Sequence, residues 1–173
     1  MTDEDGDRTP ALPCWVIGVD PGKSTGVFAL RDGLKAGPYQ GASQDALAYL
    51  EKLLQVAQLD GGDVLLAMER FAGGSARHSR QTDAQQVIGA VIELAARYRV
   101  PLVFQNPADA KSFTTNDFLR KLDLWVTPAE VGAPDADDVR DAARHALLCL
   151  ATHRAQTYCR LLERTRRPGA TID

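Results

Sequence analysis

The hydrophobic residues of this 173-residue chain fall into short continuous runs and into stripes with helical spacing. Short apolar runs that end at turn residues are typical of buried strands, whereas apolar positions three and four apart are typical of helices that cover a sheet. The runs predict strands, in chain order, at 15–20, 25–30, 34–39, 64–70 and 101–106. The stripes predict helices at 43–59, with Ser43 as N-cap, and at 82–99, 107–111 and 135–153.

The order of these elements predicts an α/β fold. The PGKS turn and the Asp32-Gly33 turn join the first three strands as an antiparallel meander. Helices and strands then alternate, which predicts two further parallel strands in a mixed central sheet flanked by helices. We expect one domain at 14–154, a flexible acidic tail at 1–13, a basic tail at 155–173 and a mobile loop at 71–80.

Composition narrows the class of protein. Hydrophobic residues make up 45% of the chain and charged residues 25%, which is typical of a globular domain in water. Three cysteines without a CxxC motif argue against a disulfide framework or a structural zinc, so a reducing, cytoplasmic compartment is expected. No apolar run is long enough for a membrane span, and the acidic N-terminus does not resemble a signal peptide.

The net charge of −3 does not exclude a nucleic-acid partner. Four acids and Arg8 in the first 13 residues account for all of it, so the remaining chain is neutral. Residues 154–173 carry five arginines against two acids, a local charge of +3. Local patches matter more than the total charge for binding DNA.

Acidic residues stand at the points where predicted strands end. Asp20 ends the first strand and Glu69 lies at the end of the fourth, so both carboxylates converge if these strands are neighbours. Asp138, Asp141 and His145 share one side of the last helix, at i, i+3 and i+7. Clustered carboxylates repel one another unless cations share the site, and oxygen ligands select Mg²⁺ or Mn²⁺. Two such ions can clamp the attacking and leaving oxygens of a phosphodiester during hydrolysis.

Each acid also has a structural explanation. Asp20 could cap the turn before Pro21, and Glu69 could pair with Arg70. Asp138 and Asp141 could act as acids that favour the helix dipole near its N-terminus, and Asp137 with Asp141 is an alternative pair. The combination of the four acids, rather than any one of them, favours catalysis.

Several motifs in order resemble one known family. IGVDPGKSTGVFAL, the strand that ends in Glu69 with Phe71 after it, QQVIGAVIELA, NPADAK and DVRDAARHAL resemble the RuvC Holliday junction resolvases, particularly their short phage-encoded members. The resemblance covers about residues 14–153. It implies an RNase H-like fold, a homodimer and Mg²⁺-dependent two-metal incision of four-way DNA junctions by paired symmetric nicks, in the host cytoplasm if the chain is phage-encoded.

The resemblance also implies roles for individual residues. Asp20, Glu69, Asp138 and Asp141 match the metal ligands. Lys111 matches a lysine expected to contact the scissile or a nearby phosphate, and Phe71 matches an aromatic residue placed near the bases of the crossover.

Further DNA contacts are expected from the basic residues that follow Glu69. Arg77, His78 and Arg80 lie close to it in the sequence and could bind the DNA backbone, the alternative being a solvated loop. His145 could relay a proton or contact a phosphate, although a surface histidine is the more ordinary interpretation. Lys111 has the same alternative, a surface position on a short helix.

Other functions are less well supported by the sequence. GVDPGKS falls one residue short of a phosphate-binding loop and is followed by a strand instead of a helix, so no nucleotide cofactor is expected. A broader branched-DNA nuclease for forks and flaps, an RNase H, and a non-catalytic RNase H-like DNA-binding protein remain alternatives. A homodimer is expected to use the broad apolar stripe of helix 82–99, unless that stripe packs on the sheet of its own chain.

Overall fold

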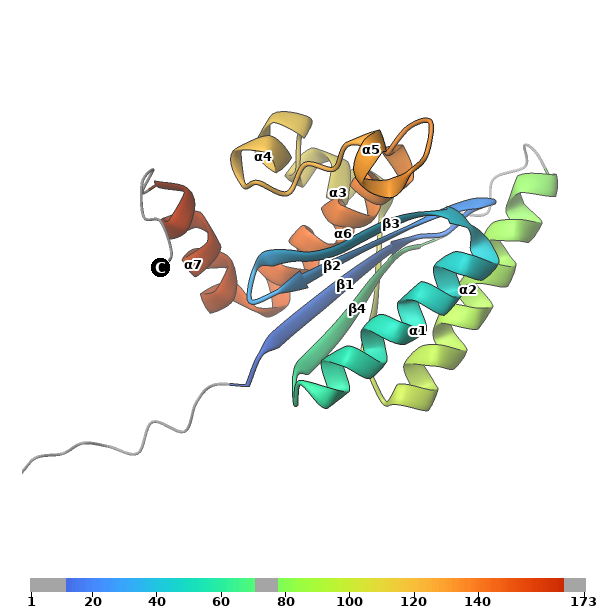
Figure 1. The fold of residues 1–173 in the computed structure, drawn as a ribbon, viewed down its shortest axis with the longest axis horizontal. Coiled ribbons are helices and arrows are strands. Elements are labelled where there is room, and N and C mark those ends of the chain that lie inside the picture. Colours follow the sequence, from blue (N-terminus) through green and yellow to red (C-terminus); the bar gives the residue numbers. More distant parts are fainter. Residues whose placement is uncertain (1–11, 71–77, 167–173) are drawn as a thin grey trace, which may run out of the picture.

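The computed structural model describes residues 12–70 and 78–166, with side chains described for 12–70 and 82–166. Its centre is one five-stranded sheet with the order β3-β2-β1-β4-β5 (Figure 1). β1 pairs antiparallel with β2 and β2 with β3, whereas β1 pairs parallel with β4 and β4 with β5. The strands are β1 (Cys14–Asp20), β2 (Ser24–Arg31), β3 (Leu34–Ala42), β4 (Asp63–Glu69) and β5 (Leu102–Gln105). The predicted α/β class and mixed sheet are confirmed.

Helices cover both faces of this sheet. α1 (Ser43–Leu59) and α2 (His78–Tyr98) lie on one face, and α6 (Asp137–His153) lies on the other (Figure 1). The shorter helices are on the α6 side: α3 (Pro107–Phe113), α4 (Asn116–Lys121), α5 (Pro128–Val131) and α7 (Ala155–Arg166). Among the described helices, none combines the length and the apolar composition that a membrane crossing needs.

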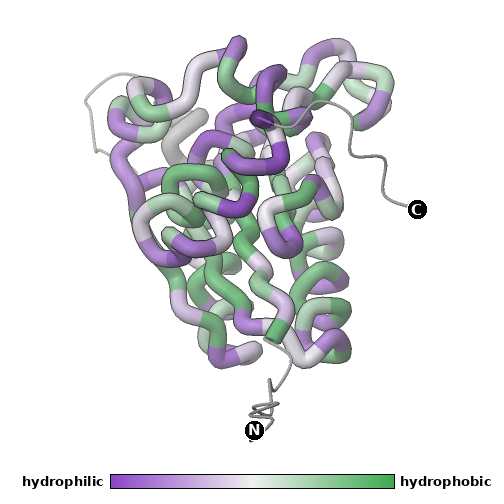
Figure 2. The backbone as a smooth tube through the Cα atoms, turned by 90° about the vertical axis from the view of Figure 1, so that its left-hand side faces the viewer, coloured by the Kyte–Doolittle hydropathy of each residue, from purple (hydrophilic) through white to green (hydrophobic). Residues whose placement is uncertain are grey.

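Alternation along the strands divides the core in two. In β1, Cys14 and Val16 belong to the core under α6, whereas Trp15, Ile17 and Val19 belong to the core under α1 and α2. Hydrophobic segments run through the middle of the molecule and hydrophilic ones lie mainly outside (Figure 2). This alternation fixes which face each strand-end side chain uses.

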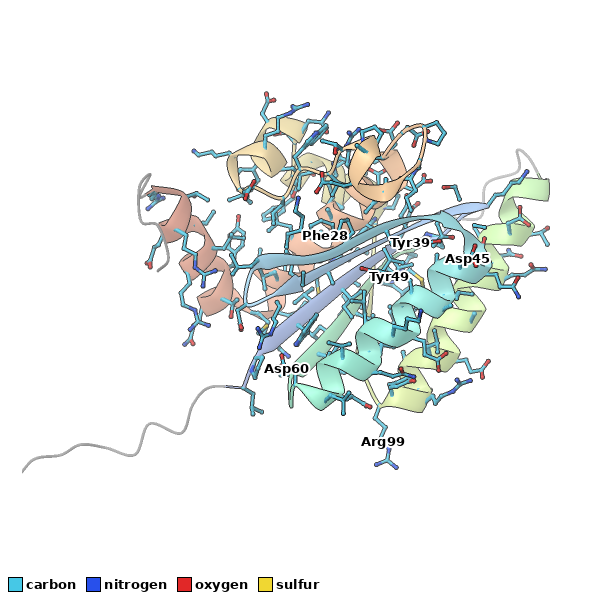
Figure 3. All side chains as sticks on the ribbon, viewed as in Figure 1. Phe28, Tyr39, Asp45, Tyr49, Asp60 and Arg99 are labelled. Carbon is cyan, nitrogen blue, oxygen red and sulfur yellow. The ribbon has the colours of Figure 1, made fainter. Side chains whose placement is uncertain are left out.

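Aromatic side chains mark both cores. Phe28 is fully buried in the core under α6, and Tyr39 of β3 stacks on Tyr49 of α1 with ring centroids 4.9 Å apart (Figure 3). Trp15 is buried and donates a hydrogen bond from Nε1 to Asp60 at 3.0 Å.

The β2–β3 turn is the two-residue hairpin that its Asp-Gly sequence predicted. Asp32 and Gly33 both have positive φ, 52° and 79°, which is the geometry that favours glycine and aspartate in tight hairpins. At the β1–β2 turn the Thr25 hydroxyl donates to the Gly22 carbonyl at 2.8 Å. The first three strands are therefore a meander, and no helix follows the GVDPGKS segment.

The prediction of a basic tail from residue 155 is wrong for residues 155–166. They form α7, whose Leu161 is buried against the β2–β3 turn at Gly33, while Arg164 donates to the Asp32 carbonyl at 3.2 Å. Between the arginines, Leu161 belongs to the core under α6, and Tyr158 and Leu162 pack against it. Residues 1–11 and 167–173 lie outside the described part of the chain.

Other boundaries also differ from the prediction. α2 begins at His78 instead of residue 82, so 78–80 are helical rather than part of a loop. Ser43 is the first residue of α1 rather than its N-cap; its hydroxyl donates to the Gly22 carbonyl at 2.8 Å. The stripe of α2 considered for dimerisation, including Val87, Val91 and Leu94, is buried against the sheet of its own chain.

Candidate functional site

Asp20 and Glu69 lie side by side because their strands are parallel neighbours. Val19 pairs with Met68, so the next residue of each strand, Asp20 and Glu69, stands at the same edge. Both positions continue the strand face that packs against α6, the face of Val16 in β1 and Ala67 in β4. The two carboxyl groups lie close enough for Glu69 to raise the pKa of Asp20. The predicted convergence of these two acids is confirmed.

Two glycines let α6 approach this edge. Gly26 pairs with Asp20 across the β1–β2 hairpin, and a β-carbon on Gly26 would collide with the backbone of Asp138. A β-carbon on Gly18 would collide with the Ala142 carbonyl and lie 2.9 Å from the Ala146 nitrogen. The helix therefore rests directly on the strand backbones, which brings Asp138 and Asp141 to the end of β1.

The electrostatics of Asp20 reflect this crowding. Burial raises the pKa of the Asp20 carboxyl far above its ordinary value, and the charges of Glu69, Asp141 and Asp138 raise it further. The pKa of Asp138 is also raised, mainly by burial, and a hydrogen bond from Ser24 partly offsets the rise. The four acids therefore form one interacting group in which the charges of the other three raise the pKa of Asp20.

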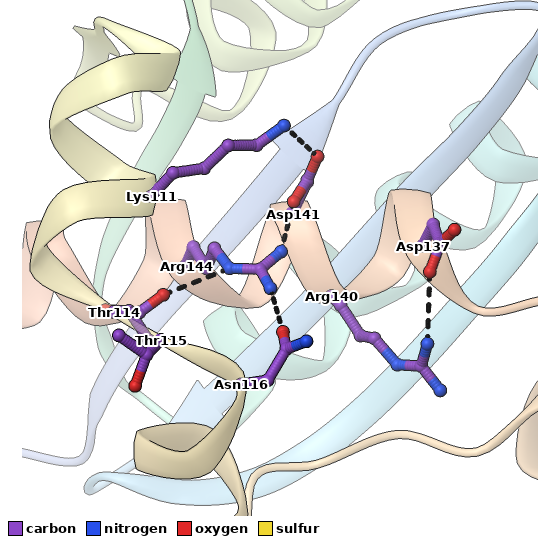
Figure 4. A pocket seen from close by; sticks show the side chains of 8 residues that line it. All are labelled: Lys111, Thr114, Thr115, Asn116, Asp137, Arg140, Asp141 and Arg144. Atoms are coloured by element: carbon purple, nitrogen blue, oxygen red, sulfur yellow. Dashed lines mark hydrogen bonds and ion pairs between the residues drawn. The ribbon is translucent and has the colours of Figure 1, made fainter.

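A pocket opens on each side of this group. Glu69 and Asp138 line one of about 410 Å³, together with the β1–β2 turn at 21–24. Asp141 lines the other, of about 380 Å³, where Lys111 Nζ lies 2.9 Å from Asp141 Oδ2 (Figure 4). The hydrogen bond to Asp141 raises the pKa of Lys111, so the lysine side chain stays protonated beside the acids.

The oxygen atoms of the four acids are of the ligand type that divalent cations bind. Carboxylate oxygens are the ligands that Mg²⁺ and Mn²⁺ prefer, and the raised pKa of Asp20 reflects negative charge that a cation would neutralise. Among the described side chains, however, no three metal-binding groups are arranged to hold one ion. Lys111 and Arg144 instead engage Asp141 from two sides. The role of the four acids as metal ligands stays a prediction.

His145 is not the surface residue that the sequence favoured. Its side chain is only 2% exposed, and its Nε2 lies 4.0 Å from Glu69 Oε2. The side-chain amide of Gln105 in β5 lies 2.9 Å from Nδ1. In the orientation in which its oxygen accepts from the Cys149 N–H, its nitrogen donates to Nδ1. The neutral ring therefore carries its proton on Nε2. Burial lowers the pKa of His145 to about 4, so the ring is neutral. A side chain this buried is not exposed for direct contact with DNA, and its Nε2 lies near Glu69 without a hydrogen bond to it.

The structure does not describe the side chains of the four other residues that were predicted to contact DNA. Phe71 and Arg77 lie outside the described residues. His78 and Arg80 belong to the first turn of α2, and their side chains are not described. Asp137, the acid ranked below Asp138, is 79% exposed and pairs with Arg140 at 3.1 Å. It lies away from the acid group, as expected.

Two arginines of α6 lie at the site and were not predicted from the sequence. Arg144 is 13% exposed and Arg140 is 15% exposed, and both line the pocket beside Asp141 (Figure 4). The available signal was spacing: Asp137, Arg140, Asp141 and Arg144 recur at i, i+3, i+4 and i+7, a second polar stripe on the same helix.

Solved structures similar to this chain include two RuvC structures. One is Thermus thermophilus RuvC in complex with a Holliday junction substrate, with a TM-score of 0.56, 16% identity, and coverage of 83% of this chain and 97% of that one. Another is a structure of Thermus thermophilus RuvC with a TM-score of 0.53 and the same identity and coverage. No protein-family model and no curated protein matches the chain. At this identity the comparison establishes the fold, and the chain has the RNase H-like fold of RuvC.

Proposed function

We propose that this protein is a divalent-cation-dependent endonuclease that resolves four-way DNA junctions. The observation that carries the proposal is the buried carboxyl of Asp20 beside Glu69, with Asp138 and Asp141 brought to it by α6. Similarity to RuvC, including a RuvC bound to a Holliday junction substrate, supports branched DNA as the substrate. Phosphodiester hydrolysis is the chemistry that clustered acids at a sheet edge suit best.

We assign a separate role to each group of residues in the site. Mg²⁺ or Mn²⁺, held by Asp20, Glu69, Asp138 and Asp141, would supply Lewis-acid activation of the phosphodiester and of water. Lys111, 58% exposed at the pocket mouth, turns its ammonium from Asp141 to a phosphate oxygen when DNA arrives. Neutral His145 lies behind Glu69, with 4.0 Å between its Nε2 and Glu69 Oε2, and adds no charge to the acid group. The cut leaves a 5′-phosphate and a 3′-hydroxyl.

Resolution of a junction requires two cuts. One chain carries one acid group and cuts one strand, so paired symmetric nicks require a homodimer. The apolar stripe of α2 is buried within the chain, so the subunits meet through other surfaces.

A panel of labelled DNAs tests the proposal. The full chain is incubated with a four-way junction, a fork, a flap, an RNA–DNA hybrid and a linear duplex, each with Mg²⁺ and with chelator. We expect junction cleavage that requires Mg²⁺ and gives symmetric nicks. Equal cutting of forks, flaps and junctions would favour a broad branched-DNA nuclease, and cutting of the hybrid alone an RNase H. Binding without any cutting would identify a non-catalytic DNA-binding protein.

A further inference from the structure

The pocket beside Asp141 extends away from the acid group along α6. We call it the arginine pocket and define it by the side chains that line it: Lys111, Thr114, Thr115, Asn116, Asp137, Arg140, Asp141 and Arg144 (Figure 4). Its volume of about 380 Å³ is far more than one water molecule needs. Asp141 and Lys111 stand at the end of the pocket nearest the acid group, so a strand held over the acids could continue into it.

The two arginines are held in place by the protein and still have N–H groups free. Arg144 donates from Nε to the Thr114 carbonyl at 3.1 Å and from its terminal nitrogens to Asp141 and Asn116. Of the five N–H groups of a guanidinium, two remain on Arg144 without a described protein partner. These fixed side chains lose little freedom when they bind a ligand.

Arg140 is fixed in a different way. It donates from Nε to the Val126 carbonyl at 2.9 Å and from Nη1 to Asp137 at 3.1 Å, and its guanidinium lies 3.8 Å from the centre of the Trp125 ring. Three of its N–H groups have no partner among the described residues. Arg140 and Arg144 lie one helical turn apart, so both guanidinium groups border one space.

The remaining walls also suit an anion. Three cations line the pocket, against the two carboxylates of Asp137 and Asp141, of which Asp141 belongs to the acid group. The Thr114 hydroxyl is buried in the wall and has no hydrogen-bond partner in the part of the chain that the structure describes. Thr115 and Asn116 add neutral polar groups. Guanidinium forks and hydroxyl groups match the oxygens of a phosphate.

We propose that the arginine pocket binds a backbone phosphate of the DNA strand that runs away from the cut. This inference rests on the proposed function and adds Arg140 and Arg144 as residues that position the strand. A phosphate contact there fixes the register of the strand without reading its sequence. The competing explanation is that both arginines only tie α6 to the 114–127 segment.

Thr115 offers a matched pair of variants. Its hydroxyl accepts a hydrogen bond from the Phe118 backbone N–H at 3.2 Å and so caps α4. Asparagine and aspartate both cap helices well, so Thr115→Asn and Thr115→Asp preserve α4 and differ only in one negative charge within the pocket. Binding of a labelled four-way junction is measured in chelator, where no cleavage occurs. We expect Thr115→Asp to bind about tenfold more weakly than Thr115→Asn.

Arg140→Gln provides an independent measurement with Arg97→Gln as its control. Arg97 lies on α2, across the sheet from the pocket, and is 55% exposed. Junction affinity is followed against salt concentration. We expect Arg140→Gln to reduce the slope of log affinity against log salt by about 0.9, the value for one lost phosphate contact, and Arg97→Gln to leave it unchanged.

The outcomes separate this inference from the proposed function. If the chain cuts junctions and both Thr115 variants bind alike with the salt slope of Arg140→Gln unchanged, the inference is wrong and the function stands. If binding depends on the pocket charge and nothing is cut with Mg²⁺, the pocket is a DNA phosphate site and the proposed cleavage is wrong. A reduced slope with the expected difference between the Thr115 variants supports the phosphate site.

Discussion

Gly26 of β2 lies directly against the backbone of Asp138 in α6, with no space for a side chain between them. Because Gly26 also pairs with Asp20, this contact sets the spacing between the strand acid and the helix acid. We predict that Gly26→Ala displaces α6, lowers the free energy of unfolding by about 1–3 kcal/mol and abolishes cleavage. Thermal unfolding and a junction-cleavage assay measure the two effects.

Gly89 is the matched control for that substitution. It lies exposed in α2, and a β-carbon built on it meets nothing within 4 Å. Gly89→Ala should therefore stabilise the protein by about 0.5–1 kcal/mol through helix propensity and leave cleavage intact. Unimpaired cleavage by Gly26→Ala would show that close contact of α6 with β2 is unnecessary.

Asp20 gives a prediction about pH in the absence of divalent cations. The pKa of Asp20 is raised in the folded chain, so the folded state holds a proton that the unfolded state releases above about pH 4. The parent therefore loses stability as pH rises above that value, and Asp20→Asn loses less, because only the raised pKa of Asp138 remains. We predict that Asp20→Asn raises the Tm in chelator, by more at pH 8 than at pH 5.

Addition of Mg²⁺ is the companion measurement. If cations neutralise the acid group, Mg²⁺ at pH 8 raises the Tm of the unmodified chain more than that of Asp20→Asn. A Tm difference between the two proteins that is the same at pH 5 and pH 8 would contradict the crowding of charge around Asp20.

Because of buried His145, we predict that the protein loses stability as pH falls. Burial lowers its pKa to about 4, below the 6.5 of an ordinary histidine, so the stability is fully present above pH 6.5 and declines as pH falls through 4. His145→Gln should be less stable than the parent at pH 7, with a gap that narrows by pH 4.5. Urea midpoints at the two pH values measure this.

The exposed histidine of the same helix serves as the control. His153 stands in the last turn of α6, and His153→Gln should follow the pH profile of the parent. A gap between His145→Gln and the parent that stays constant with pH would mean that the buried ring does not account for the acid sensitivity.

α7 is part of the folded domain, and Leu161 tests this. Leu161 is 2% exposed within the core under α6, whereas Leu59 at the end of α1 is 89% exposed. Leu161→Ala should lower the free energy of unfolding by about 2–5 kcal/mol and Leu59→Ala by less than about 0.5 kcal/mol. Equal losses of stability for Leu161→Ala and Leu59→Ala in chemical denaturation would mean that residues 155–166 are not part of the folded domain.

The sheet and two of its acids could be predicted because local patterns determine them. Alternation with period two sets the face of each strand residue, and the Asp32-Gly33 turn sets the first hairpin. Parallel pairing of β1 with β4 then brings Asp20 and Glu69 to one edge. Only the pairing of β1 with β4 joins residues distant in the sequence, and from the sequence alone it had to be assumed.

The rest of the site depends on tertiary contacts that no local pattern shows. The burial of His145 follows from its contact with Gln105, forty residues away, and the approach of α6 follows from glycines that sequence alone describes only as weak strand formers. α4 and α5 are only 6 and 4 residues long, too short for a hydrophobic period. Their signals were capping residues, of which Thr127 with Glu130 forms a capping box.

The most direct test of the account is cleavage by Glu69→Gln beside Glu93→Gln. Glu69 is 29% exposed next to Asp20, whereas Glu93 is 72% exposed on α2 and pairs with Arg97. With Mg²⁺ and a labelled four-way junction, we predict that Glu69→Gln loses cleavage by at least about 100-fold while still binding the junction in chelator, and that Glu93→Gln cuts at the parent rate. Cleavage by Glu69→Gln at the parent rate would contradict the account.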